Sequence, residues 1–318
     1  MKALVTGCVG QDGSYLCELL LSKGYEVHGL IRRSTAEDLQ RAHLPGLKNV
    51  IFHYADMTDY GPLASVIRSV QPDLVFNLAA QSHVAVSFQN PVYTFNVNAL
   101  GANRLLEAIR EHCPKARFYQ ASTSEMFGLS PSPQNEETPL KPQSPYAISK
   151  CAAHYSIRVY REAYKMFVVS GILFNHESPR RGSEFVTRKI TKALARIKYG
   201  KQEKLKLGNL EAKRDWGYAP DYVSAMIQML EQDVPSDYVI ATGEQHTVLE
   251  FLELAAEIAE VELPGHLEID SSLMRPAEVP DLRGDASKAR KELGWKPTIS
   301  FEELVRKMVE HDLEVESH

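Results

Sequence analysis

Apolar positions fall into short runs that are separated by longer segments with helical spacing. Lys2–Thr6 is such a run and predicts a strand. The segment Ser14–Ser22 places Leu16 and Leu20 on one side, as an amphipathic helix does, and Gly24 ends it. The chain therefore opens with a strand followed by a helix.

The same alternation continues along the chain. Further strands are predicted at 26–31, 50–55, 74–78, 117–120, 167–174 and 238–242. Helices are predicted at 91–112, from 145 and from 185 onward, and at 220–231, 287–295 and 301–313. Alternating strands and helices with short connections favour a parallel sheet covered on both faces. The predicted fold class is α/β, a Rossmann-type doubly wound parallel sheet with a smaller, interleaved C-terminal substrate domain.

Some aromatic and aliphatic positions are interpreted as core. Tyr93, Val97 and Leu100 recur at helical spacing within 91–112 and are expected to pack inward, although Tyr93 lies near the helix start and could touch a cofactor phosphate. Trp216 is interpreted as a packing residue rather than a platform for stacking a base.

Three glycines follow the first strand at once. Gly7, Gly10 and Gly13 form a GxxGxxG pattern between the predicted strand and the predicted helix. A glycine turn at this place brings backbone N–H groups and a helix N-terminus against a pyrophosphate. A plain tight turn is the alternative interpretation. The position of the pattern, at the first junction between strand and helix, favours a dinucleotide site.

This site defines the expected domains. Residues 1–174 are predicted to form an NADP-binding Rossmann domain, to which segments near 212–243 return. Residues 175–318 are predicted to form mainly a substrate domain for a nucleotide sugar. The sequence shows neither an internal repeat nor a low-complexity linker, so we expect the two domains to interleave.

The choice of cofactor rests on the end of the second strand. Arg32 and Arg33 lie there, and two hydroxyl residues follow them. An NAD-preferring site usually ends this strand with a carboxylate that binds the ribose 2′-OH, whereas an arginine accommodates a 2′-phosphate. Because no acidic residue follows this strand until Glu37, the sequence favours NADP. A solvated basic turn is the alternative.

Two other strand ends carry candidate cofactor contacts. The strand 50–55 ends at Asp56 and Met57, and Asp56 could accept a hydrogen bond from the adenine amino group. The strand 74–78 runs into 79–83, where small side chains let a backbone lie close to a cofactor. Because ligands bind beyond the carboxyl ends of parallel strands, we expect these strand ends to line one site.

A helix with catalytic potential begins near residue 144. Ser144 can cap it, and Pro145 suits its first position. Tyr146 and Lys150 are four residues apart and therefore share one face. An ammonium beside a phenol favours the phenolate, whose ordinary pKa is about 10, and can make it a base near neutral pH.

Two further polar residues lie where the preceding strand ends. Thr123 and Glu125 follow the strand 117–120, and we predict a catalytic set of Thr123, Glu125, Tyr146 and Lys150. A turn cap at Glu125 and an ordinary amphipathic pair in the helix are the alternatives.

Basic candidate ligands lie in the C-terminal half. Arg180 and Arg181 beside Gly182 suit the recognition of phosphate oxygens. Of the cations on the helix that starts near Phe185, Lys189 is predicted to bind a diphosphate, with simple solvation as the alternative. Further substrate candidates, weighed against ion pairs on the surface, are Arg214, Arg275 and Glu278.

Composition excludes several function classes. The 318 residues are 44% hydrophobic and 24% charged, as in a folded soluble protein, and the net charge of -5 argues against a nucleic-acid partner. No apolar run approaches the roughly 20 residues that span a bilayer, and no signal-peptide pattern is present. The four cysteines form no CxxC pair and no metal-type cluster, so buried free thiols are expected. We expect a cytoplasmic protein with no metal and no membrane partner.

Taken together, the motifs resemble the extended short-chain dehydrogenase/reductase family, which acts largely on nucleotide sugars. TGxxGxxG at the start, TSE at 123–125 and YxxxK at 146–150 carry the resemblance to the superfamily. Within it, the likeness runs along nearly the whole chain and is to the dehydratases that act on GDP-mannose. The stretches that carry it are GQDGSYL (10–16), AQSHVAVSF (80–88), YQASTSE (119–125), NHESPRRG (175–182) and RDWG (214–217).

The resemblance implies Thr123, Glu125, Tyr146 and Lys150 as the catalytic set. It implies contacts to NADP at Gly7, Gly10, Gln11, Asp12, Arg32, Arg33, Asp56, Leu78, Gln81, Ser82, Tyr93, Lys150, His176 and Arg181, and substrate contacts that include Ser82 and Asn175. It also implies a homodimer or homotetramer. The segment 34–47, which in the family can reach a neighbouring subunit's cofactor site, is shorter here and departs from the family's usual sequence.

The implied reaction oxidises C4 of GDP-mannose, eliminates water across C5–C6 and reduces C6, with one NADP throughout. Tyr146 would take the 4-hydroxyl proton, Glu125 would take the C5 proton and assist loss of the 6-hydroxyl, and Thr123 would hydrogen-bond the 4-oxygen. The product, GDP-4-dehydro-6-deoxymannose, is a precursor of GDP-deoxyhexoses such as GDP-fucose and GDP-rhamnose.

Two other functions stay open from the sequence. One is a sibling enzyme: a reductase of the 4-keto product, which would consume NADPH, or a nucleotide-sugar epimerase or decarboxylase. The other is a non-catalytic nucleotide sensor, which would tend to lose Glu125, Tyr146 or Lys150. All three residues are present.

Overall fold

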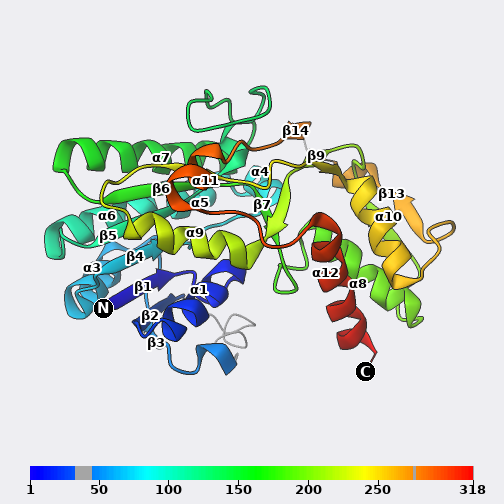
Figure 1. The fold of residues 1–318 in the computed structure, drawn as a ribbon, viewed down its shortest axis with the longest axis horizontal. Helices are drawn as coiled ribbons and strands as arrows, with labels where there is room; N and C mark the ends of the chain where they lie inside the picture. Colours follow the sequence, from blue (N-terminus) through cyan, green and yellow to red (C-terminus); the bar gives the residue numbers. More distant parts are fainter. Residues whose placement is uncertain (33–44, 275–276, 318) are drawn as a thin grey trace.

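A computed structural model describes residues 1–32, 45–274 and 277–317 of the chain. Seven parallel strands form one sheet in the order β11-β6-β5-β4-β1-β2-β3 (Figure 1). The strands are β1 (Lys2–Thr6), β2 (Glu26–Ile31), β3 (Ile51–Tyr54), β4 (Leu74–Asn77), β5 (Arg117–Thr123), β6 (Val168–Leu173) and β11 (Tyr238–Ile240). The winding reverses between β1 and β4, and the carboxyl ends of strands beside such a reversal form a ligand crevice.

Helices cover both faces of this sheet, which confirms the predicted fold class. One apolar core lies under α1 (Gln11–Ser22), α9 (Ala219–Glu231) and α11 (Ser287–Leu293). A second core lies under α3 (Tyr60–Val70), α6 (Gly101–His112) and α7 (Pro145–Tyr164). Apart from the edge strand β3, the sheet strands are mostly buried from both sides, as a parallel sheet requires.

A smaller unit follows the sheet at the right of Figure 1. Its core is formed by α8 (Val186–Lys198), α10 (Val248–Ala259) and α12 (Phe301–Glu316), which pack on one another. Trp216 lies in this core, with ring centroids 5.4 Å from Phe251 and 6.1 Å from Phe301, which confirms it as a packing residue. The chain leaves the sheet after β6, returns to it at α9 and β11, and then leaves it again.

Short elements complete the fold. The paired strands of the smaller unit are β7 (Asn175–Glu177) with β10 (Trp216–Tyr218), β8 (Leu205–Leu207) with β13 (Leu267–Ile269), and β9 (Lys213–Arg214) between β12 (His246–Thr247) and β14 (Asp281–Leu282). The remaining short helices are η1 (Pro45–Leu47), α4 (Val84–Gln89), α5 (Pro91–Phe95), η2 (Asn96–Leu100), η3 (Ser124–Met126) and η4 (Ser271–Leu273).

The predicted helix at 91–112 contains a wide turn. Between α5 and α6 the chain makes a π-helical turn, η2. Val97 is buried as expected, but Tyr93 is 42% exposed and Leu100 is 45% exposed, so the core prediction was wrong for both. A π turn holds one extra residue, and it therefore rotates the apolar stripe relative to a continuous α-helix.

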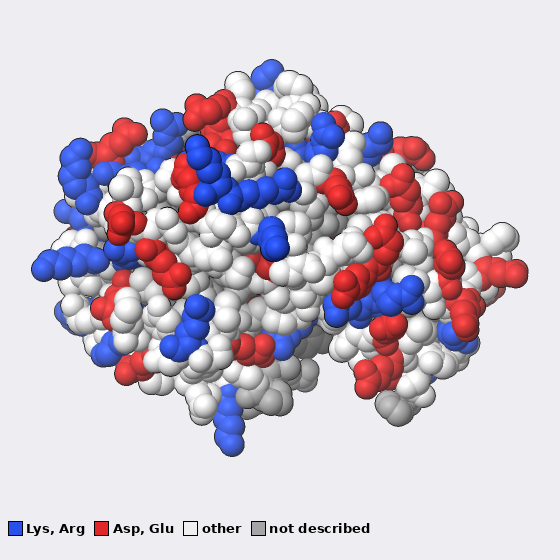
Figure 2. Space-filling view, in the orientation of Figure 1, with Lys and Arg blue, Asp and Glu red and all other residues white. Residues whose placement is uncertain are grey.

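Surface and thiol chemistry agree with an ordinary folded domain. All four cysteines are buried free thiols, as predicted. Among the described residues no helix combines the length and apolar character that crossing a membrane requires. Figure 2 shows acidic side chains gathered over the unit that carries α10 and α12, and mixed charges over the sheet unit.

Candidate active site

The glycine turn after β1 leaves no room for side chains. Gly7 has φ +65, and a Cβ on it would lie 2.9 Å from the Ala79 backbone nitrogen. A Cβ on Gly13 would lie 2.2 Å from the Gly7 carbonyl oxygen. Gly10, the N-cap of α1, has no side-chain cap, so the first turn of α1 presents its N–H groups to the crevice. This cradle fits the pyrophosphate of a dinucleotide.

Arg32 lies at the carboxyl end of β2. Its Nη1 donates a 2.9 Å hydrogen bond to the hydroxyl of Tyr93 on α5, so the structure brings these two predicted cofactor contacts together. Asp56, beyond the end of β3, accepts hydrogen bonds at Oδ1 from the backbone N–H and the hydroxyl of Thr58, at 2.8 and 2.7 Å. Arg33 lies outside the described residues.

The end of β4 is held by side chains from neighbouring elements. The Thr6 hydroxyl accepts hydrogen bonds from the N–H groups of Leu78 and Ala79, at 3.1 and 3.0 Å. The Asn98 amide, in the π turn, accepts from the Gln81 N–H at 2.9 Å and donates to the Gln81 carbonyl at 3.0 Å. Sequence reasoning missed Asn98. An asparagine between two apolar residues of an inward-facing helix was the available signal.

The four predicted catalytic residues meet at the ends of β5 and α7. Thr123 ends β5, and its hydroxyl accepts a 3.3 Å hydrogen bond from the Glu125 N–H in η3. Tyr146 and Lys150 lie in the first turns of α7, which is capped by a 3.1 Å hydrogen bond from the Ala147 N–H to the Ser144 hydroxyl. Glu125, Tyr146 and Lys150 are all buried.

Burial dominates the electrostatics of the Tyr146–Lys150 pair. It raises the pKa of Tyr146 to about 12, with the Glu125 charge acting in the same direction and a hydrogen bond with Thr123 acting against it. Burial also lowers the pKa of Lys150 to about 8, opposed by the Asp12 charge. In the chain alone the pKa of Tyr146 is therefore raised, and the lowering that was expected from the ammonium of Lys150 does not outweigh burial. The Lys150 Nζ instead donates a 2.8 Å hydrogen bond to the Ala121 carbonyl.

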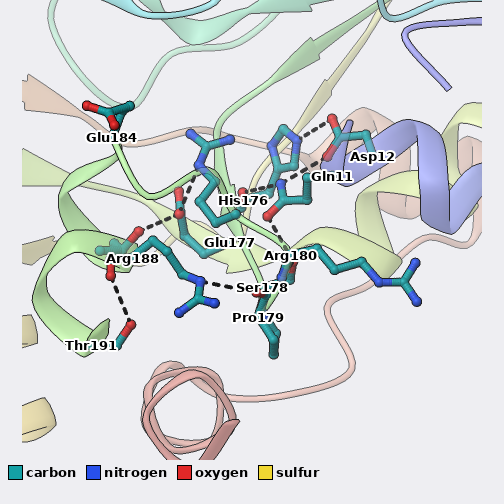
Figure 3. A network of polar contacts seen from close by, with 12 residues as sticks. Gln11, Asp12, His176, Glu177, Ser178, Pro179, Arg180, Glu184, Arg188 and Thr191 are labelled. Atoms are coloured by element: carbon teal, nitrogen blue, oxygen red, sulfur yellow. Dashed lines mark hydrogen bonds and ion pairs between the residues drawn. The ribbon is translucent and has the colours of Figure 1, made fainter. Parts of the chain in front are cut away.

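The NHESPRRG turn connects α1 with the smaller unit (Figure 3). His176 lies beside Asp12, with 2.8 Å between Nε2 and Oδ2, and the Ser178 hydroxyl donates to Gln11 Oε1 at 2.8 Å. The carboxylate of Glu177 accepts from the Thr187 hydroxyl at the start of α8. Sequence reasoning missed the pairing of Gln11 with Ser178, because residues so far apart in the chain give no local signal.

Both arginines of this turn are engaged with the protein. Arg180 forms a 2.8 Å ion pair with Glu18, and its guanidinium carbon lies 4.0 Å from the ring centroid of Tyr15. Arg181 forms a 3.1 Å ion pair with Glu177. The Arg181 charge also acts to lower the pKa of Tyr146. Of the two, Arg181 is thus the one that faces the candidate catalytic set.

The predicted substrate ligands are scattered around the crevice. Arg214 is buried and forms a 3.2 Å ion pair with Glu278, so the structure joins these two candidates to each other. Lys189 is partly buried in α8. Ser82 is exposed after β4, and Asn175 begins β7, while Arg275 lies outside the described residues. Their contacts with a substrate stay predictions.

The glycine cradle at the switch point of the sheet, with a buried Tyr146–Lys150 pair beside it, defines a nicotinamide-dependent enzyme of the short-chain dehydrogenase/reductase class. The family model described as GDP-mannose 4,6 dehydratase matches residues 4–308. The chain belongs to the GDP-mannose 4,6-dehydratase family.

Known proteins extend this comparison. GDP-mannose 4,6 dehydratase 2 of Arabidopsis thaliana is 57% identical over 98% of this chain and 87% of its own length. GDP-mannose 4,6 dehydratase of Homo sapiens is 47% identical over 98% of this chain and 91% of its own length. The solved structure of Thermus thermophilus UDP-glucose 4-epimerase with NAD has a TM-score of 0.87 and 30% identity, covering 98% of this chain and 99% of that one. RMD from Pseudomonas aeruginosa with NADPH has a TM-score of 0.82 and 27% identity, covering 99% of both chains.

Proposed function

We propose that this protein converts GDP-mannose to GDP-4-dehydro-6-deoxymannose and water. Family membership supports the substrate and the reaction. The observation that carries the chemistry is the buried carboxylate of Glu125 beside Tyr146, because a hydride-transfer site needs an added acid–base group to eliminate water.

We propose the following roles for Tyr146, Glu125 and Thr123. Tyr146 takes the proton of the 4-hydroxyl as C4 is oxidised to a ketone, which acidifies C5–H. Glu125 takes the C5 proton and gives it to the departing 6-hydroxyl, which leaves as water. Tyr146 then returns its proton to C5. Thr123 hydrogen-bonds the 4-oxygen and holds the sugar in line.

Lys150 supports the tyrosine through its charge. When protonated, Lys150 stabilises the Tyr146 phenolate. Its charge thereby opposes burial, which raises the pKa of Tyr146. The chemistry that a bound nicotinamide cofactor supplies is hydride acceptance from C4, hydride return to C6 and a positive ring charge. The whole cycle is therefore redox-neutral.

A direct assay tests this function. The protein is incubated with GDP-mannose without added reductant, and the 4-keto product is followed by mass and by carbonyl trapping. We expect product to form while no NADPH is consumed. In a parallel sample that holds the 4-keto sugar and added NADPH, stoichiometric consumption of NADPH would instead identify a reductase, and absence of any turnover of GDP-mannose would overturn the proposal.

For the cofactor we propose NADP rather than NAD. Arg32 lies at the end of β2, where it donates a hydrogen bond to the Tyr93 hydroxyl, and an arginine at this strand end supports pairing with a 2′-phosphate. We expect Arg32→Ala to weaken NADP binding about 10- to 100-fold, which corresponds to one charge-assisted hydrogen-bond interaction. NAD binding should change less than about 3-fold, because its 2′-OH does not need the guanidinium.

Calorimetric titration of apoprotein with each dinucleotide measures the effect. Lys23→Ala removes an exposed cation at the far end of α1 and should change neither affinity. Equal losses for NADP and NAD in Arg32→Ala, or equal affinities in the unmodified protein, would contradict the assignment.

We also propose that the protein is a homo-oligomer, a homodimer or a homotetramer. Helix α5 and the π turn η2 lie beside α7, and together they carry an exposed apolar face that is formed by Val92, Phe95, Leu100, Ile148, Tyr155 and Val159. Val92 is 81% exposed and Val159 is 55% exposed, which is costly for a monomer in water. In a dimer with two-fold symmetry, the same face of a second copy packs against this one and buries both.

Substitution of Val159 by glutamate tests this interface. We expect sedimentation equilibrium to give a lower mass for Val159→Glu than for the unmodified protein, because a buried unpaired carboxylate opposes association. Val234→Glu changes a residue that is 71% exposed elsewhere and should keep the assembly intact. A monomeric unmodified protein, or an unchanged mass in Val159→Glu, would exclude this interface.

A further inference from the structure

The side chain of His176 has a hydrogen-bond acceptor at both of its ring nitrogens. Nδ1 lies 2.7 Å from the carbonyl oxygen of Phe174, and Nε2 lies 2.8 Å from Oδ2 of Asp12. A neutral imidazole carries one N–H and can satisfy one acceptor, whereas the imidazolium carries two. The geometry therefore requires the charged form when Asp12 is ionised.

This imidazolium is enclosed by the protein. His176 is 8% exposed, and its ring stacks on Tyr222 of α9 with centroids 4.6 Å apart. With both nitrogens engaged, His176 has no N–H left for a dinucleotide. The cofactor contact that the resemblance implies for His176 stays a prediction, and the ring nitrogens act on Asp12, another residue predicted for that site.

The partner carboxylate lies in the first turn of α1. Asp12 Oδ1 accepts a 3.0 Å hydrogen bond from Gln11 Nε2, which also donates to the His176 carbonyl at 3.0 Å. Gln11 and Asp12 thus connect the turn that forms the glycine cradle to His176 of β7, the strand that precedes Arg181. The connection joins segments that are 164 positions apart in the chain.

We propose that Asp12 and His176 form a carboxylate–imidazolium pair that is intact at neutral pH, positions the first turn of α1 and keeps the Asp12 carboxylate ionised toward Lys150. Both are positioning residues, because they act through α1 and through the field at Lys150. The catalytic part of this proposal rests on the proposed function; the charge state of the pair does not.

The charges around the pair support this arrangement. The groups that face it are Arg181 after β7, Tyr222 on α9, Tyr119 on β5, and Tyr146 and Lys150 on α7. Burial opposes the charged form of both partners, but their mutual attraction outweighs it. The pKa of Asp12 is consequently lowered and the pKa of His176 is raised.

The pair has a definite pH window. The contribution of His176 to stability is full below the ordinary histidine pKa of about 6.5 and is lost as the pH rises through its raised pKa. The contribution of Asp12 is present above the ordinary carboxyl pKa of about 3.9 and is lost as the pH falls through its lowered pKa. The pair is intact between these limits.

The ¹⁵N chemical shifts of His176 test the proposal without any turnover. In the unmodified protein we expect both ring nitrogens to be protonated at pH 7. In Asp12→Asn we expect a neutral ring with the proton on Nδ1, because an asparagine amide can donate to a bare Nε2 and keep the same shape. A neutral His176 in the unmodified protein, or an imidazolium that persists at pH 7 in Asp12→Asn, would overturn it.

A matched control and a catalytic readout complete the experiment. Glu18→Gln removes another paired carboxylate of α1 and should leave the His176 shifts unchanged. In Asp12→Asn the alkaline limb of kcat/KM should move to lower pH, because of the two partners it is Asp12 whose charge raises the pKa of Lys150. An unmoved limb would overturn the link to Lys150. Failure of the proposed dehydration would leave the chemical-shift result standing.

Discussion

Replacement of Glu125 by glutamine is expected to lower the rate of dehydration about 10²- to 10⁴-fold, the usual contribution of a positioned general acid–base group. Glutamine has nearly the same shape, but it cannot accept the C5 proton or pass it to the leaving hydroxyl. Because Glu125 is buried in η3 and is not among the predicted dinucleotide contacts, binding of the dinucleotide should stay within about 3-fold of the unmodified protein.

Product formation under single-turnover conditions and dinucleotide affinity measure these two effects. Glu137→Gln, an exposed residue of the loop that follows, serves as the control and should keep the full rate. If Glu125→Gln still forms the 4-keto product at nearly the original rate, Glu125 is not the base, and the proposed reaction loses its acid–base group.

Replacement of Tyr146 by phenylalanine should have a comparable effect, a loss of about 10²- to 10⁴-fold. The ring stays in its buried place, so the fold should be kept, but the group that takes the 4-hydroxyl proton is gone. Dehydration needs C4 to be oxidised first. Tyr146→Phe should therefore stop the reaction before elimination, whereas Glu125→Gln stops it afterwards.

Exchange of label at C4 separates the two variants. With GDP-mannose deuterated at C4, Glu125→Gln should still exchange that deuterium between substrate and bound cofactor, and Tyr146→Phe should not. Tyr164→Phe, at the exposed end of α7, is the matched control and should behave like the unmodified protein. Rapid exchange in Tyr146→Phe would show that another group takes the 4-hydroxyl proton.

Local chemistry accounts for what the sequence could predict. The glycine spacing, the four-residue interval between Tyr146 and Lys150, and the capping serine at 144 each act within one turn of chain. The structure contains the expected elements, and β5 extends to Thr123, beyond the predicted end at Gln120. Strand alternation was enough to predict the parallel sheet.

Other features depend on contacts between distant segments. Arg214 and Glu278 were separate substrate candidates, and only the fold shows that they pair at 3.2 Å. The pairing of Asp12 with His176 was invisible for the same reason. Tyr93 and Leu100 lie on either side of the π turn's extra residue, which shifts the helical spacing between them and which the apolar pattern did not reveal.

The sign of the Tyr146 pKa shift also needed the structure. The sequence shows a cation one helical turn away but not how deeply both groups are buried, and desolvation of the phenolate is the larger effect in the chain alone. The pKa of Lys150, about 8, predicts that its supporting charge is lost as the pH rises through that value. Catalysis should accordingly decline on the alkaline side.

The central claim is that one active site oxidises C4, eliminates water and reduces C6 of the same sugar. The most direct measurement is the position of the label after turnover of GDP-mannose deuterated at C4, read by ¹H and ²H NMR of the product. The account predicts one deuterium on C6 of GDP-4-dehydro-6-deoxymannose, with no net change in NADPH. The account would be contradicted if the 4-keto product carried no deuterium at C6. It would also be contradicted if the sugar kept its deuterium at C4 and no 4-keto product formed.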